Sequence, residues 1–523
     1  MTMKFRHALA AASVLLAALA AHAQDAPAKP PLPCARFSIA STDRYKDVVT
    51  ALKLPLPPDL PGLIEGQFTF VGAGGIDSTK PCGIVFLAAD ELPQSKLAYF
   101  VLPVTKGAAT IEKLSLVGAA PVEGQPDMAQ IGDALCFRRT ANYLVLYPGE
   151  PAIIQGLGND VFTKDYSAKD TVLYTSVDLA ALRSRAPKGY KDFIDNARKN
   201  AGGNAPDNLT TADARGRQIG EDMVFSLLEK IDTMSVAVML NDATLHVTST
   251  LSSFPKLARR EFAKPILPEG ALLTVHMVYP TAESAGWLHG FVKMIFDTDI
   301  PLGGAHLTDD QKAQTRTIVE DMSTVLVADS QSMAVESRDG YTVVTVVNQY
   351  TGDVDLPAAI KKGIGKLEDL AEAAGQPRDL AVDDLKSGGG IRIRDLHPGK
   401  DGPGAIFVTQ KGKTAVITYS TNDLDGPSTV TLSPTEKISD LLSAKADLGA
   451  TLAAIDRSPM SDELPIPPEQ RKTLIEALKG KKASLSIAAN AAGEIVINLD
   501  APAELLKIAT QTRTGQPPAP PPQ

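Results

Sequence analysis

The feature that most constrains the fold is a compound hydrophobic pattern that recurs along the chain. It consists of an apolar strand, one or two amphipathic helices, a pair of alternating strands and a helix that begins at a proline. The clearest copy has its strand at residues 172–177, its hairpin at residues 234–251 and its closing helix at Pro255. Proline suits the first position of a helix because no hydrogen bond is lost there. The pattern predicts a mixed α+β architecture.

A second copy follows at a nearly constant distance. The strand openers Leu173 and Leu272 are 99 residues apart, and the turns at Asn241 and Asp339 are 98 residues apart. The closing helix of this copy begins at Pro357. Near-equal offsets predict a duplicated unit. The alternative is a chance recurrence of turns and helix-opening prolines, which are individually common.

Shortened versions of the pattern flank this pair at residues 97–151 and 452–502. Because an isolated hairpin is marginally stable in water, each unit must pack its sheet against helices or against the next unit. We therefore expect an elongated multi-domain α+β protein of tandem units, each with a strand, helices, an antiparallel hairpin and a Pro-opened helix. The expected divisions are a signal peptide (1–23), a Pro/Ala-rich arm (24–33), an N-terminal α+β domain (34–168), a first repeat (169–268), a second repeat (269–375), a C-terminal α+β domain (376–512) and a disordered Pro-rich tail (513–523).

The arrangement over roughly residues 97–366 resembles that of exported bacterial proteins of unknown function built from repeated α+β units. The resemblance rests on the order of elements and not on an invariant motif. It implies a repeated fold and brings no activity with it.

The N-terminus predicts export. Lys4 and Arg6 precede an apolar run at residues 8–21, and Ala-His-Ala follows at residues 21–23. This is the pattern of a secretory signal peptide with a small-residue cleavage site, with a retained membrane anchor as the alternative. We expect a periplasmic or secreted protein.

Charge argues against nucleic acid as a partner, and hydropathy argues against a membrane span. The formal net charge is −9, and removal of Lys4 and Arg6 with the signal peptide makes it −11. An acidic protein is repelled by phosphate backbones, so nucleic acid is not an expected partner. No apolar run after the signal peptide approaches the ~20 residues of a membrane helix, so we expect no membrane span in the mature chain.

Three cysteines, Cys34, Cys82 and Cys136, lie in the first third of the chain. An oxidising compartment permits one disulfide among them. Cys34 follows a proline-rich arm and Cys82 begins a strand, so the predicted disulfide joins Cys34 and Cys82.

Catalytic and metal motifs are incomplete. Ser253 and Lys256 have the Ser-x-x-Lys spacing of penicillin-binding families, but the Lys-Thr-Gly motif is missing and Ser253 also suits a helix cap. Asp423 and Asp425 fit part of a calcium loop that lacks the ligands expected at its first and twelfth positions. They are the candidate metal ligands, against a solvated turn as the alternative. No cofactor is predicted.

The least ordinary segment is a glycine-rich cationic loop at residues 386–404. Arg392 and Arg394 alternate with isoleucines, so both guanidinium groups are expected to face one way, with His397 and Lys400 nearby. Such a group of cations suits a carboxylate or phosphate ligand. The alternative is an ordinary surface hairpin.

These observations predict an exported, non-enzymatic protein that binds another protein or an envelope component. Two alternatives remain open. One is a carrier of an apolar or lipid ligand held between sheet and helices, suggested by the apolar helical stripe around Trp287. The other is a serine-type hydrolase that uses Ser253 and Lys256.

Overall fold

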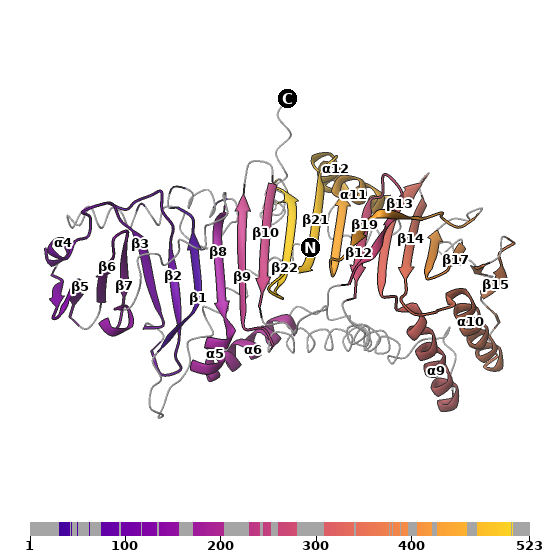
Figure 1. Cartoon of the computed structure of the whole chain (residues 1–523), viewed down its shortest axis with the longest axis horizontal. Coiled ribbons are helices and arrows are strands. Elements are labelled where there is room, and N and C mark those ends of the chain that lie inside the picture. The colour runs from indigo at the N-terminus through magenta and orange to yellow at the C-terminus, as the bar shows by residue number, and fades with distance from the viewer. Residues whose placement is uncertain are drawn as a thin grey trace. The chain divides into compact units, whose positions relative to one another are not determined.

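The computed structural model shows how the strands and helices are arranged (Figure 1). Apart from a few isolated positions, it describes residues 31–41, 75–93, 96–116, 118–132, 135–155, 171–202, 230–240, 244–252, 260–279, 308–338, 341–375, 380–386, 389–395, 405–420, 426–457 and 468–503. The predicted signal peptide, most of the Pro/Ala-rich arm and the Pro-rich tail lie outside these residues.

The chain divides into two compact units. The first unit comprises residues 1–205, 221–254 and 501–516, and the second comprises residues 206–220, 255–500 and 517–523. Each is built on a large antiparallel sheet. Of the residues that the structure describes, 48% are in strands and 24% in helices, so the predicted α+β architecture of tandem units of helices and hairpins is wrong. The periodicity identified hairpins correctly, but local pattern does not reveal that strands distant in sequence join them into one sheet.

The sheet of the first unit has ten described strands. Their order across the sheet is β10-β9-β8-β1-β2-β3-β7-β6-β5-β4, with every neighbouring pair antiparallel. The strands are β1 (Leu32–Ile39), β2 (Cys82–Ala88), β3 (Ala98–Pro103), β4 (Ala120–Val122), β5 (Gln125–Ile131), β6 (Leu135–Arg139), β7 (Tyr143–Tyr147), β8 (Thr171–Asp178), β9 (Thr233–Leu240) and β10 (Thr244–Leu251).

The first unit also contains three described α-helices and one 3₁₀ turn. They are α4 (Ile111–Ser115), the 3₁₀ turn η2 (Pro151–Ile153), α5 (Leu179–Arg185) and α6 (Pro187–Gly202). Helix α5 starts directly at the end of β8, where the Asp178 carboxylate accepts a hydrogen bond from the Ala181 N–H at 2.7 Å. This contact satisfies one of the free N–H groups of the first turn. The apolar face of α5 and α6 then packs on Ala35 of β1 and Val177 of β8.

The second unit repeats this sheet strand for strand. Its order is β22-β21-β20-β12-β13-β14-β18-β17-β16-β15, again antiparallel throughout, and β11 and β19 form a separate pair. The strands are β11 (Phe262–Ile266), β12 (Leu273–Val278), β13 (Ser330–Arg338), β14 (Tyr341–Gln349), β15 (Leu380–Asp384), β16 (Gly390–Asp395), β17 (Ala405–Lys411), β18 (Thr414–Ser420), β19 (Thr431–Ile438), β20 (Leu442–Asp447), β21 (Lys482–Ala489) and β22 (Ile495–Pro502).

The described helices of the second unit are α9 (Asp309–Leu326), α10 (Leu356–Ala373), α11 (Leu448–Asp456) and α12 (Pro468–Ala477). Helices α10, α11 and α12 occupy the chain positions of α4, α5 and α6, whereas α9 has no counterpart among the described residues of the first unit. Helix α11 begins at the end of β20, where Asp447 accepts a hydrogen bond from the Ala450 N–H at 2.9 Å, as Asp178 does at the start of α5. Helix α10 has proline at its first turn, as predicted at Pro357, and packs on the strands that follow it.

The shared strand order corrects the repeat. Strand β8 of the first unit corresponds to β20, and β1 corresponds to β12. Leu173 lies in β8, whereas Leu272 directly precedes β12, so the two openers mark strands in different positions, although a helix and a hairpin follow each of these strands. Two of the predicted domain boundaries also fall inside sheets, because β1 pairs with β8 across residue 168 and β14 pairs with β18 across residue 375.

Candidate functional site

The predicted cationic cluster is only partly described. Arg392 and Arg394 both lie on β16, two residues apart, and so face the same side of the sheet as predicted. The guanidinium of Arg394 pairs with Asp383 at 2.8 Å, and that of Arg392 lies 5.5 Å from the centre of the Phe407 ring. Both side chains thus contribute to the pairing of β15, β16 and β17. His397 and Lys400 lie outside the described residues, so the anion site stays a prediction.

The other predicted site residues give no arrangement to assess. Asp423, Asp425, Ser253 and Lys256 all lie outside the described residues. Within the described part of the chain, no group of three or more His, Cys, Asp or Glu side chains is placed to hold a metal ion.

The predicted disulfide is corrected by the register of β1 and β2. All three cysteines are free thiols. Cys82 lies opposite Ile39, whereas Cys34 lies five residues earlier on β1, beside the opposite end of β2. At about 3.3 Å per residue the two α-carbons are roughly 17 Å apart, well beyond the reach of a disulfide. The sequence placed both residues next to the same sheet but did not reveal which ends of the strands they occupy.

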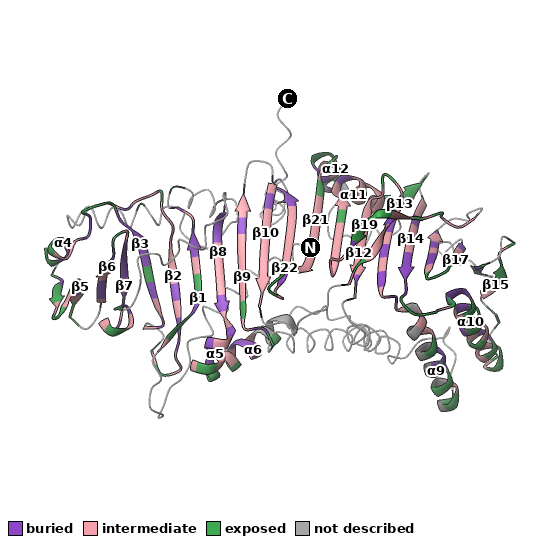
Figure 2. Cartoon of the chain, viewed as in Figure 1, coloured by how far each residue is buried: buried purple, intermediate pink, exposed green. Residues whose placement is uncertain are grey.

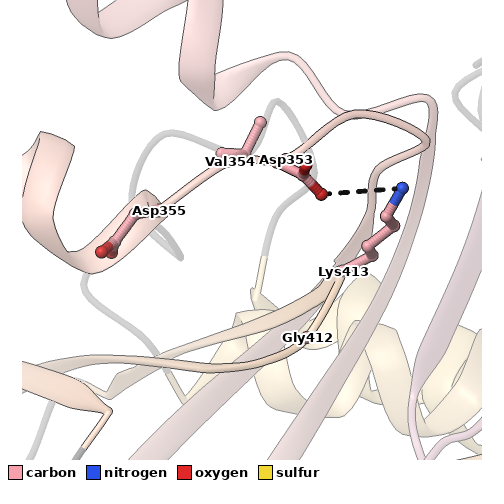
Figure 3. A pocket seen from close by; sticks show the side chains of 5 residues that line it. All are labelled: Asp353, Val354, Asp355, Gly412 and Lys413. Carbon is pink, nitrogen blue, oxygen red and sulfur yellow. Dashed lines mark ion pairs between the residues drawn. The ribbon is translucent and has the colours of Figure 1, made fainter.

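A shallow hollow of about 470 Å³ lies between the loop before α10 and the turn joining β17 to β18 (Figure 3). Asp353 and Lys413 face each other across it at 3.8 Å. Lys413 also donates to the Thr351 carbonyl, and Asp355 caps α10 by accepting from the Ala358 N–H at 3.0 Å. These polar groups hold a turn against a helix start, and none is arranged as an acid and base pair. The hollow is therefore a structural junction.

A row of apolar side chains crosses the second unit in strict register. Successive pairs join Leu499 of β22 to Leu485, Leu485 to Ala444, Ala444 to Val275, Val275 to Met333 and Met333 to Val346. Because paired residues in a sheet point to the same face, all six side chains share one face. We call this set, Leu499, Leu485, Ala444, Val275, Met333 and Val346, the second-unit strip.

The second-unit strip is only half-buried. All six side chains keep intermediate exposure, and none belongs to a buried apolar cluster among the described residues. Figure 2 shows that β21 and β22 are mostly of intermediate exposure. Beyond Val346 the row continues through Ile417 to Val408, which is 1% exposed and packs in the cluster around α10. The apolar row is thus closed at the α10 end and open over the six strands from β22 to β14.

The opposite face of β13 and β14 is more deeply buried and includes polar side chains. Ser332 and Thr345 have no exposed surface, although they alternate with the half-exposed Met333 and Val346. The β11–β19 pair and its connections bond to this face: Gln349 donates to the Ala263 carbonyl at 2.8 Å, and the Thr345 and Ser428 hydroxyls are 3.0 Å apart. Ala334, Val343 and Val347 are also fully buried on this face, so the covered face of these two strands holds both polar and apolar side chains.

Sequence reasoning found the strands of this strip but not its exposure. Leu273, Val275 and Met277 alternate with polar residues, which indicates one apolar face. The signal that was available is the absence of charge on the apolar positions combined with Ser330 and Ser332 on the alternate positions of β13. The alternation alone does not show which face the polypeptide covers.

Comparisons with known proteins add little. No family model matches the sequence, and no curated protein matches it. One solved structure, described as crystal form III of TP0453, is similar over 46% of this chain and 95% of its own chain, with 11% identity and a TM-score of 0.22. A likeness of this size carries no argument about fold or function, and the resemblance to exported repeat proteins stays a prediction.

One feature of the helices bears on the predicted partners. Among the described residues, no helix combines the length and the apolar character that crossing a membrane requires.

Proposed function

We propose that the chain is an exported, non-enzymatic binding protein whose ligand is an amphiphile with a long hydrocarbon chain, held on the second-unit strip. The carrying observation is that all six side chains of the second-unit strip keep intermediate exposure, whereas the alternate residues of β13 and β14, such as Ser332 and Thr345, are buried. A contiguous apolar row that stays partly exposed is typical of an interaction site. The proposal selects the carrier alternative among the functions predicted from the sequence.

The composition of the strip favours a hydrocarbon over a protein partner. The energetic centres of protein interfaces are enriched in Trp, Tyr and Arg. The second-unit strip has none of these and consists of five large aliphatic or thioether side chains and one alanine. It also has no charge or hydrogen-bonding group, so its contacts are limited to apolar burial. A row perpendicular to the strands extends about 4.8 Å per strand, which suits a linear chain.

Burial energetics supports a modest affinity. Roughly a dozen methylene groups transferred from water gain on the order of 10 kcal/mol. Loss of translational and conformational freedom removes at least about 4 kcal/mol of that gain. The difference corresponds to dissociation constants on the order of 10–100 μM. Such an affinity suits a carrier, which must release what it binds.

The test is fluorescence titration of the purified full chain with cis-parinaric acid, a fluorescent fatty acid. We expect saturable binding that Leu485→Glu weakens at least tenfold, because the introduced carboxylate would lose its water when a hydrocarbon covers it. The matched control is Ile266→Glu on β11, where the side chain is 57% exposed and lies off the strip. Circular dichroism confirms the fold of both variants. Absence of saturable binding, or equal loss in both variants, would refute the proposal.

A further inference from the structure

The first unit carries apolar side chains at the positions equivalent to the second-unit strip. The two helix caps align the units: Phe37 pairs with the residue three before Asp178, and Val275 pairs with the residue three before Asp447. From Phe37 the row continues to Ile84 and then to Phe100, matching Met333 and Val346. We call Phe37, Ile84 and Phe100 the first-unit strip.

The first-unit strip is also incompletely covered. Phe37 has intermediate exposure and packs against a buried cluster that includes Ile39 and Leu173. Ile84 has intermediate exposure, and Phe100 is 46% exposed, which is unusual for a phenylalanine in the middle of a sheet. The alternate residues of these strands, such as Val85 and Tyr99, are buried in a cluster on the other face. The exposure of Phe100 therefore belongs to one face of the sheet and not to a poorly packed strand.

A helix closes the row at the same end in both units. From Phe100 the row passes through Leu146 to Phe137, which is 5% exposed and packs in the cluster around α4. Val408 occupies the equivalent place beneath α10 in the second unit. The first unit thus reproduces both elements of the proposed site, an open apolar row and its closed end.

We propose that the first-unit strip is a second site for the same class of ligand, so that one chain binds two hydrocarbon chains. The inference rests on the proposed function of the second-unit strip. The two sites are not identical. In the first unit Thr175 and Ser249 occupy the places of Ala444 and Leu499, so the apolar row is interrupted after Phe37. A shorter apolar row buries less of the ligand, and we expect the first-unit site to be the weaker one.

Native mass spectrometry of the full chain titrated with palmitate counts the bound ligands directly. We expect a maximum of two palmitates on the unchanged chain, one on Phe100→Glu, one on Val346→Glu and none on the double variant. The matched controls are Leu116→Glu and Ile266→Glu, at side chains that are 78% and 57% exposed and lie off both strips. These controls should keep two palmitates.

The outcomes separate the two proposals. A single palmitate that is lost in Val346→Glu but kept in Phe100→Glu would overturn the second site and leave the proposed function intact. No palmitate on the unchanged chain would remove both. Equal loss in the strip and control variants would show attachment unrelated to the strips and would also overturn the second site. If circular dichroism shows that Val346→Glu is unfolded, Met333→Gln on the adjacent strand replaces it under the same expectations.

Discussion

At the scale of single residues, the alternation of a β-strand determines which side chains stabilise the sheet and which remain available for binding. Tyr99 and Phe100 are neighbours in β3, and their exposures are 2% and 46%. The Tyr99 side chain is not part of the first-unit strip, because it points to the opposite face of the sheet. Adjacent aromatic residues of similar size are therefore expected to have different functions.

Substitution of these neighbours by alanine measures that difference. Tyr99→Ala removes a fully buried ring and should lower the free energy of unfolding by about 3–5 kcal/mol. Phe100→Ala removes a ring that is already in contact with water and should cost less than about 1 kcal/mol. Denaturant unfolding of the two variants compares the values. Equal costs would show that Phe100 is a core residue and would weaken the first-unit strip.

The cysteines give a second prediction at this scale. Burial raises the pKa of the Cys34 thiol to about 12, with Asp178 adding to the effect, and burial also raises the pKa of Cys82 to about 12. Because the thiolate is the reactive form, both should react slowly with iodoacetamide in the folded protein at pH 8. After denaturation without a reductant, intact mass should show three alkylated thiols. A single alkylated thiol would show that two of the three cysteines form a disulfide.

Asp329 makes folding sensitive to acid. Burial acts to raise its pKa, but hydrogen bonds from Thr351 and the nearby Arg260 guanidinium outweigh burial and hold the pKa below its usual 3.8. The carboxylate therefore stabilises the folded state above pH 3.8, and this contribution is lost as the pH falls below that value. Asp329→Asn should lower stability at pH 7 and flatten its decline between pH 5 and pH 2. An unchanged pH profile would contradict this role.

At the scale of elements, two aspartates at the ends of β8 and β20 start equivalent helices. Each aspartate is the last residue of its strand and is followed by leucine. Its carboxylate accepts a hydrogen bond from the backbone N–H of the residue three positions later. The same aspartate cap thus occurs at both transitions from a strand to the helix that follows it. The equivalence of the caps is the local counterpart of the shared strand order.

Removal of each cap tests that equivalence. Asp178→Ala and Asp447→Ala should each lower the free energy of unfolding by about 1 kcal/mol, since one N–H of the first turn loses its acceptor. Thermal or denaturant unfolding of the full chain provides the measurement. A cost near zero at either position would show that the corresponding helix start does not depend on its aspartate.

Elements were predictable from the sequence where local pattern decides them. The hairpin of β9 and β10 and the Pro-opened helix α10 follow from alternation and proline placement. The pairing of β1 with β8 was not predictable, because it joins residues more than 130 positions apart and leaves no periodic trace. The site was missed for a related reason: Met333 and Val346 read as core residues, and their exposure depends on distant strands.

At the scale of the whole molecule, the two units show the same order of ten strands with the same antiparallel pairings. The number of residues that separates equivalent strands is not constant. It is smaller for β1 and β12 than for β7 and β18, because the connections between strands differ in length. This variation hides the duplication from a search at constant period. The result is a chain with two versions of one apolar row, one aliphatic and one phenylalanine-rich.

The most direct measurement is photolabelling of the full chain with a palmitate analogue that carries a diazirine near its methyl end, followed by peptide mass spectrometry. The account predicts that labels concentrate on β1 to β3 around Phe37, Ile84 and Phe100, and on β12 to β14 around Val275, Met333 and Val346, and that excess palmitate suppresses both sets. Labels confined to other segments, or labels that excess palmitate does not reduce, would contradict it.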